Sequence, residues 1–342
     1  MSIVGNSMVL KSLVTLLFSY LLTLLFGHFF IKGMLRKKIS QPINPDGPQT
    51  HFIKAGTPTS GGLFFIAGIC LSLTLFGNFK NPYLYLPLLA ILLFGLIGLI
   101  DDLIKIKRKE SIGLTTLQKL AMQILAAALL FYLYTKATGK IDLLLNNSDK
   151  RFGTWYPMVF LIYVVTIVNA VNISDGLDGL AVGIALSPLL LLAIITTLVG
   201  IGVYKADLLI GMAEESFNLL LVLSGVIGSI LAFLWYNGAK AQVFMGDVGS
   251  HALGAIIAVS ALLLKVEVVI LIASALFFIE VLSSLLQIIS IRVFSRRLFF
   301  MAPLHHHFEK KGISEERIVV RFQIASALAT VTGALLFMTK IG

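Results

Sequence analysis

Long apolar runs, separated by short polar segments, recur along the whole chain of 342 residues. A helix needs about 20 consecutive apolar residues to cross a hydrocarbon core of about 30 Å. We predict ten spans, at 12–31, 61–79, 82–100, 117–135, 156–173, 180–201, 217–236, 250–264, 267–290 and 320–339. Only a helix satisfies every backbone group within its own segment in lipid. The predicted fold class is therefore an all-α integral membrane protein, with one polytopic domain over 1–342.

Composition agrees with this pattern and excludes other classes. The chain is 58% hydrophobic and 13% charged, whereas a soluble domain carries about a quarter charged residues. A soluble globule and a disordered chain are thus excluded, and the single cysteine, Cys70, excludes a disulfide scaffold. The apolar runs are also longer than the strands of about 9–11 residues in membrane barrels.

The basic residues predict an orientation. With ten spans both termini face one compartment, and 18 of the 27 Lys and Arg residues fall on the other side. These lie in the connections 32–60, 101–119, 174–179, 237–249 and 291–321. The positive-inside rule puts those connections in the cytoplasm and both termini outside. Topology and anionic lipid thus explain the net charge of +10, and we expect no nucleic-acid partner.

Polar motifs gather at the predicted cytoplasmic ends of the spans, where charge is costly and marks function. Asp101 and Asp102 follow the apolar run 96–100. Two adjacent carboxylates repel each other unless a cation or proton neutralises them. The pair indicates a Mg²⁺ site or a general base. The alternative is a hydrated helix end with Lys105 and Lys107 as counter-ions.

Two further acidic motifs are richer in glycine and amides. Asn169, Asn172 and Asp175 are spaced by three, close enough to share a helical face, and the second Asp-Gly pair follows at Asp178. Oxygen ligands with glycine nearby suit Mg²⁺ and phosphate, although a plain turn is the alternative. Asp247 lies in Phe-Met-Gly-Asp-Val-Gly-Ser, after Asn237-Gly238. Its alternative is a helix start capped by Asp247 or Ser250.

Two loops carry possible phosphate ligands. The segment 56–62, Gly-Thr-Pro-Thr-Ser-Gly-Gly, lacks the lysine of a P-loop. Its glycine amides, hydroxyls such as that of Thr59, and nearby Lys54 are candidate donors to phosphate, or the segment only leads into a helix. We place His305, His306 and His307 on a loop, where they would bond phosphate, transfer a proton or, less readily, bind zinc. A solvated loop is the alternative.

Taken in this order, the motifs resemble the phospho-N-acetylmuramoyl-pentapeptide-transferase family of bacterial inner membranes. That family belongs to the polyprenyl-phosphate N-acetylhexosamine-1-phosphate transferases, which share the Asp101-Asp102 pair and the motifs 169–179 and 244–250. The segment with His51, Lys54 and Thr59, and the segment 302–309, point to the muramoyl-pentapeptide branch. Ser60 stands where the family usually has methionine, which bears on local packing.

The resemblance implies transfer of phospho-MurNAc-pentapeptide from UDP-MurNAc-pentapeptide to undecaprenyl phosphate, giving lipid I and UMP with Mg²⁺. It implies that Asp247, Asp175, Asp101 and Asp102 hold the metal, and that the catalytic residues are Asp101, Asp102, Asp247, His305, His306 and His307. The implied substrate-binding residues are Lys54, Thr59, Asn172, Asp175, Gly176, Leu177, Asp178, Asn237 and Phe244, with Phe244 stacking on uracil. Direct attack and a phospho-enzyme route both stay open.

Two other functions compete with this interpretation. A related transferase would use UDP-GlcNAc on the same lipid carrier, but the three histidines argue against it. A secondary transporter would place coupling carboxylates near the membrane midplane, where only Glu280 lies, and we expect Glu280 to be bonded inside the bundle. The expected partners are the two substrates and membrane lipid, and a homodimer is left open.

Overall fold

The computed structural model describes residues 3–40, 54, 56–138, 155–202 and 213–339. Within these residues all regular secondary structure is helical, as predicted. The helices are α1 (Ile3–Arg36), α2 (Gly62–Leu73), α3 (Pro82–Arg108), α4 (Thr116–Thr138), α5 (Tyr156–Ile173), α6 (Leu180–Gly200), α7 (Ala213–Asn237), α8 (Gly246–Leu263), α9 (Glu267–Ala273), α10 (Ala275–Phe294), α11 (Leu304–Lys310) and α12 (Glu315–Thr339). Nine helices in the described ranges are long and apolar enough to cross a membrane. The predicted membrane bundle is confirmed.

Helix α8 lies at the centre of the bundle and is buried along nearly its whole length. It packs between α3 and α5, with α2 also against it. Small residues allow these close approaches, as they do in other membrane helices. A side-chain carbon at Gly98 of α3 would collide with the carbonyl of Asp247, and one at Gly254 would collide with the backbone of Val168. The glycine at position 98 therefore brings the acidic end of α3 against the start of α8.

The predicted span at 61–79 is wrong as a continuous helix, because α2 ends at Leu73. The chain turns there, and the Gly77 N–H donates to the Leu73 carbonyl. Twelve residues of helix are only about 18 Å long. The chain still crosses the bundle, since α2 begins beside Met245, near the end of α3 that carries Asp101, whereas α3 begins at the opposite end. Residues 74–81 complete this passage without helix.

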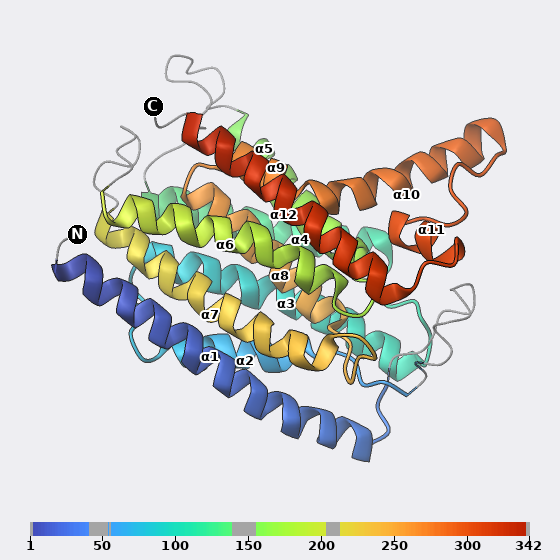
Figure 1. Ribbon diagram of the computed structural model, residues 1–342, viewed down its shortest axis with the longest axis horizontal. Coiled ribbons are helices and arrows are strands. Elements are labelled where there is room, and N and C mark those ends of the chain that lie inside the picture. The colour runs from blue at the N-terminus through green and yellow to red at the C-terminus, as the bar shows by residue number, and fades with distance from the viewer. Residues whose placement is uncertain (1–2, 41–53, 55, 139–154, 203–212, 340–342) are drawn as a thin grey trace.

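The predicted span at 267–290 is also divided. Helix α9 ends at Ala273, and α10 begins at Ala275 and leaves the bundle at an angle (Figure 1). The Thr330 hydroxyl of α12 donates to the Ala273 carbonyl at 3.4 Å. The break between α9 and α10 therefore leaves this carbonyl at the end of α9 with a hydrogen-bond donor. Helix α12 lies close to α9 because Gly333 faces Val269 without a side chain.

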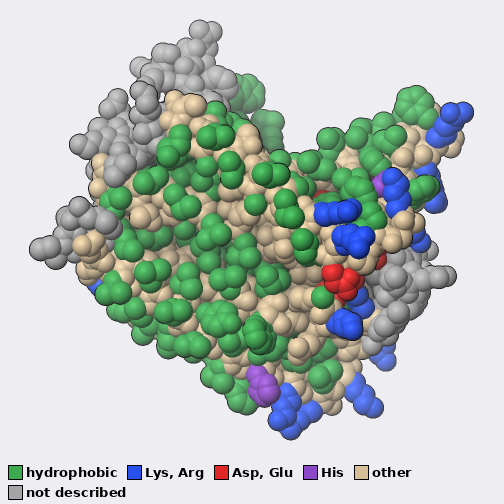
Figure 2. All heavy atoms as spheres, viewed as in Figure 1, with side chains coloured by type: hydrophobic (Ala, Val, Ile, Leu, Met, Phe, Trp, Pro, Cys, Tyr) green, Lys and Arg blue, Asp and Glu red, His purple; other side chains and the backbone are tan. Residues whose placement is uncertain are grey.

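Two motifs lie on helices where we predict loops. Helix α3 continues eight residues beyond the predicted end of its span, so Asp101, Asp102 and Lys105 form its last helical turns. The histidines 305–307 lie on α11. Most charged side chains visible in Figure 2 gather at the end of the molecule that holds these two elements, while the rest of that face is largely hydrophobic.

The start of α1 and the end of α12 both lie at the end of the bundle opposite to α11 and to the acidic end of α3 (Figure 1). Which side of the membrane either end faces stays a prediction.

Candidate active site

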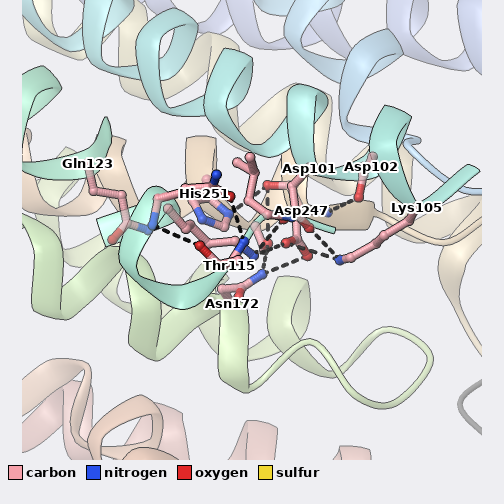
Figure 3. A network of polar contacts seen from close by, with 12 residues as sticks. Asp101, Asp102, Lys105, Thr115, Gln123, Asn172, Asp247 and His251 are labelled. Atoms are coloured by element: carbon pink, nitrogen blue, oxygen red, sulfur yellow. Dashed lines mark hydrogen bonds and ion pairs between the residues drawn. The ribbon is translucent and has the colours of Figure 1, made fainter. Parts of the chain in front are cut away.

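Three carboxylates from two helices form the centre of the site. Asp101 and Asp102 come from α3 and Asp247 from the first turn of α8, and each offers an oxygen within 4.8 Å of the others. Figure 3 shows these side chains pointing toward one another, with Asn172 of α5 beside them. The structure therefore brings together four predicted residues that lie up to 146 positions apart in the chain.

Asp247 accepts contacts from three other helices. Its Oδ2 lies 2.7 Å from Lys119 Nζ of α4 and 3.2 Å from Lys105 Nζ of α3. Its Oδ1 accepts a hydrogen bond of 3.0 Å from the Asn172 amide, which also donates to the Ser250 hydroxyl at 2.8 Å. His251 Nδ1 lies 2.8 Å from the Asp247 carbonyl. This carboxylate is the point at which α3, α4, α5 and α8 meet.

Asp101 is buried and paired with the same two lysines. Lys105 Nζ lies 2.6 Å from Asp101 Oδ2, and Lys119 Nζ lies 3.3 Å from Oδ1. The Leu114 N–H, in the connection between α3 and α4, also donates to Oδ1 at 2.8 Å. Lys105 thus fits the alternative in which it serves as a counter-ion, but it does so inside the site and not at a hydrated helix end.

Asp102 accepts bonds from the start of α8. Its oxygens accept from the N–H groups of Asp247 and Val248 at 3.0 and 3.4 Å, and from the Ser60 hydroxyl at 3.0 Å. A carboxylate is favourable at the positive end of a helix dipole. The alternative prediction of a cap from Asp247 or Ser250 is therefore wrong, because a residue of another helix fills that role.

The turn between α5 and α6 carries Asp175 beside this cluster. Asp175 is partly buried. Burial raises the pKa of the Asp175 carboxyl well above its usual range, and the charges of Asp247 and Asp102 act in the same direction. Asn169, one turn before Asn172, exchanges hydrogen bonds with Gln123 of α4 instead. Asn172 of this motif therefore belongs to the site, whereas Asn169 joins α5 to α4.

A second polar cluster joins Lys54 to the other end of this turn. Lys54 Nζ lies 2.7 Å from both Asp178 Oδ1 and Glu315 Oε1, and the Ala241 N–H donates to Asp178 Oδ2 at 2.9 Å. Burial lowers the pKa of the Lys54 ammonium, but the bonds to the two carboxylates outweigh it and raise that pKa above its ordinary value. Asn237 accepts from the Gly179 N–H and donates to the Val243 carbonyl.

In the segment 56–62, the amides of Gly61 and Gly62 do not point to a ligand site. The N–H groups of Gly61 and Gly62 donate to the carbonyls of Phe244 and Met245 at 2.9 Å, and the Phe244 N–H donates to Pro58. The predicted cradle of glycine amides is therefore wrong for Gly61 and Gly62, because these two donors are used inside the protein. Thr59 is buried in this pairing, while the Phe244 side chain stays partly exposed beside it.

Leu177 is buried in the hydrophobic core, next to Gly176 of the turn. His51, named in the same motif as Lys54, lies outside the described residues.

The three histidines of α11 have three different partners. His305 is buried, with Nδ1 3.0 Å from Glu280 Oε2 of α10 and Nε2 against Gly176. His306 Nδ1 lies 2.8 Å from Glu309 Oε2. His307 stacks on Phe300 and accepts its N–H at 3.1 Å. Burial and nearby Lys311 lower the pKa of the His307 imidazole.

These contacts do not support the alternative in which the histidines bind zinc. Among the described residues, the group of His, Cys, Asp and Glu side chains close enough to hold a metal is Asp101, Asp102 and Asp247, without a histidine. The expectation that Glu280 is bonded inside the bundle is confirmed by its contact with His305.

Four residues that contact the site have roles that were not predicted. Lys119 and Glu315 were not predicted at all, Ser60 was predicted only as a possible phosphate donor, and Lys105 only as a counter-ion at a hydrated helix end. Lys105 follows Asp101 by four positions, a spacing that predicts contact on one helical face. Nothing in the sequence signals the partners of the other three, because their contacts join segments 42 to 261 positions apart.

The donor set suits a hard divalent cation. Mg²⁺ prefers oxygen ligands, and carboxylates are the common protein ligands. Asp247 and Asp101 each offer oxygens that contact lysine ammonium groups, an amide or a backbone N–H. Asp102 is less available, since both of its oxygens accept bonds from α8 or Ser60.

Comparison with known proteins identifies the family. Residues 84–265, which include the three carboxylates, match glycosyl transferase family 4. The chain is 39% identical to the phospho-N-acetylmuramoyl-pentapeptide-transferase of Desulfotalea psychrophila over 93% of this chain and 90% of that protein. It is 36% identical to the protein of the same name from Blochmanniella floridana, over 98% of this chain and 94% of that protein. With this similarity over nearly its full length, the chain belongs to the phospho-N-acetylmuramoyl-pentapeptide-transferase family.

Proposed function

We propose that this protein transfers phospho-MurNAc-pentapeptide from UDP-MurNAc-pentapeptide to undecaprenyl phosphate, and that it forms lipid I and UMP in a Mg²⁺-dependent reaction. The names of the two relatives support the transferase activity. The observation that carries the proposal is the meeting of Asp101, Asp102, Asp247 and Asn172 at one end of a membrane bundle. A soluble nucleotide and a lipid-borne phosphate can meet only at such an end.

The chemical problem is the repulsion between two anions. A phosphate acceptor must approach a diphosphate, and a bound Mg²⁺ would neutralise part of their charge. We assign Asp247 and Asp101 as the residues that would hold the metal, with Asp175 beside them. Unlike Asp102, Asp247 and Asp101 do not accept hydrogen bonds from the N–H groups at the start of α8. Asp102 instead holds the start of α8, and with it Asp247, in position.

The acceptor needs little help from a base. A phosphate monoester has a second pKa near about 6, so much of it is already dianionic at neutral pH. The contribution of the protein is then mainly to orient the two substrates, which can supply much of the rate acceleration.

The second polar cluster would hold the nucleotide. Lys54 carries a positive charge fixed between Asp178 and Glu315, and the partly exposed Phe244 offers a ring for uracil to stack on. Gly176 lies between this cluster and the carboxylates in the same turn. We assign the diphosphate to the space between them, and the sugar-peptide part to the side of His306.

We propose that this end of the bundle faces the cytoplasm of a bacterial inner membrane. UDP-linked sugars are cytoplasmic, and most of the predicted cytoplasmic basic residues lie in connections at this end. The carboxylates gathered there also disfavour a transporter, which would place them near the midplane.

The test is product formation by the purified full chain. Native protein with UDP-MurNAc-pentapeptide and radiolabelled undecaprenyl phosphate should give UMP and a labelled lipid product with Mg²⁺ and neither when the metal is chelated. UDP-GlcNAc serves as the competing donor. Product from UDP-GlcNAc alone would assign the protein to the related transferases, and no product from either donor would overturn the proposal.

A further inference from the structure

The carboxylate cluster contains two cations of its own, Lys105 and Lys119. Both ammonium groups bridge α3 and α8, because each lies within 3.3 Å of an oxygen of Asp101 and of Asp247. Three of the four oxygens of these two carboxylates contact an ammonium, and the fourth, Asp247 Oδ1, accepts the Asn172 amide. The two lysines therefore neutralise the same carboxylates that a bound metal would neutralise.

A divalent cation and these ammonium groups compete for the same oxygens. Mg²⁺ binds carboxylate oxygens at about 2.0–2.1 Å, whereas Lys119 Nζ lies 2.7 Å from Asp247 Oδ2 and 3.3 Å from Asp101 Oδ1. A divalent ion would add two positive charges beside the two ammonium groups that already share Asp247 Oδ2, and like charges this close repel each other strongly in a partly buried site. Metal binding between Asp101 and Asp247 therefore requires at least one ammonium to leave.

Lys119 is the one that can leave. Lys105 lies one turn after Asp101 on α3, and its shortest contact is with Asp101 Oδ2, so it can keep that partner. Lys119 comes from the first turns of α4 and reaches both carboxylates across helix boundaries. Its side chain is 19% exposed, against 13% for that of Lys105, so it is the more open of the two lysines to solvent.

We propose that Lys119 is an internal counter-ion, which neutralises Asp101 and Asp247 in the metal-free protein and gives them up when a divalent cation binds. This inference rests on the proposed function for the metal site. The released ammonium stays within a side-chain length of the metal.

The experiment measures metal binding without substrate. The full chain in detergent is titrated with Mn²⁺, and free Mn²⁺ is followed by electron paramagnetic resonance. Lys119→Met removes the competing charge and should bind Mn²⁺ at least about tenfold more tightly than native protein. Lys119→Arg keeps the charge and should bind like the native protein. Lys107→Met is the matched control, since Lys107 is an exposed lysine of α3.

A second measurement uses only the native chain and does not depend on how the variants fold. A water-soluble amine-acylating reagent is applied with and without Mn²⁺, and modification at Lys119 is quantified by mass spectrometry. Release from the carboxylates should increase acylation at Lys119, while acylation at Lys107 stays constant.

Equal or weaker Mn²⁺ binding by Lys119→Met overturns the inference, and so does acylation of Lys119 that does not respond to Mn²⁺. These failures are distinct from failure of the proposed function. If native protein makes the lipid product but Lys119→Met binds Mn²⁺ no more tightly, only the counter-ion role is lost. If Lys119→Met binds Mn²⁺ more tightly but native protein makes no lipid product, only the proposed function is lost.

Discussion

Asp101 and Asp102 are adjacent in the chain, yet their carboxylates have different partners. Asp101 faces the ammonium groups of Lys105 and Lys119, while Asp102 accepts the amides at the start of α8. Successive residues of a helix point about 100° apart, so the pair cannot share one set of neighbours. The sequence predicts that both matter, but only the packing of α3 on α8 separates a carboxylate paired with two lysines from one that supports a helix.

Asp247→Asn should reduce Mg²⁺-dependent UMP release by about 100-fold or more, because metal catalysis depends on ligands that can neutralise the ion. The amide keeps the size of the side chain and removes its charge. Lys107→Met, on the exposed side of α3, should retain activity. Release close to the native rate by purified Asp247→Asn would remove this residue from the metal site.

Lys54→Met should raise the KM for UDP-MurNAc-pentapeptide about tenfold and leave the KM for undecaprenyl phosphate nearly unchanged. The substitution removes uniform binding of one substrate, which affects KM more than kcat. Lys54→Arg retains the charge and should show a smaller effect. Steady-state kinetics with each substrate varied in turn would refute the assignment if both KM values changed equally.

The raised pKa of Lys54 predicts the pH range in which its ion pairs stop contributing to stability. A lysine whose folded pKa lies above its ordinary 10.5 contributes stability that is complete below that value and is lost as the pH rises through the higher folded pKa. The difference in unfolding temperature between native protein and Lys54→Met should therefore stay constant from neutral to moderately alkaline pH and fall only above 10.5. A difference that declines already near neutrality would contradict this.

At the scale of elements, the site depends on how helices end and meet. Hydropathy predicts the spans well where a run is bounded by polar residues, as at α5. It fails at α2 and α9, because neither the turn at Gly77 nor the break at Ser274 changes the mean hydropathy of the run enough to be seen. It fails at α3 for the opposite reason, because the charged residues from Asp101 onward lower the hydropathy while the helix continues to Arg108. These boundaries depend on hydrogen bonds and packing with other helices.

The contact between α11 and the turn 174–179 leaves no room for a side chain at Gly176. A side-chain carbon at Gly176 would collide with Nε2 of His305, which Glu280 holds in place. Gly176→Ala should lower the unfolding temperature by several degrees, an effect of about 1–3 kcal/mol from overpacking.

Combining Gly176→Ala with His305→Ala tests this contact directly. Removal of the imidazole makes room for the new methyl group, so the double variant should lose less stability than the sum of the two single variants. Additive losses in thermal unfolding would show that the two residues do not interact.

At the scale of the whole molecule, the bundle separates a charged end from an apolar body (Figure 2). The positive-inside rule predicts that the charged end is cytoplasmic. The two ends are separated by α3, whose 27 residues span about 40 Å.

Orientation can be tested by labelling single cysteines in a Cys70→Ser background. Glu110→Cys lies after the acidic end of α3, and Asn78→Cys lies before its start; both native side chains are exposed. A membrane-impermeant thiol reagent should reach Asn78→Cys from outside intact spheroplasts and Glu110→Cys only in inverted vesicles. Labelling of both from the same side would contradict the predicted topology.

The sequence by itself determined the membrane class, the family, and the acidic and histidine motifs that bear chemistry, because hydropathy, charge and short motifs are local properties. It did not determine which polar groups neutralise one another. The pairing of Lys119 with Asp247, of Ser60 with Asp102 and of Lys54 with Glu315 joins distant segments. Only the tertiary structure decided these pairs, since the close packing of α3 on α8 sets which charges share a site.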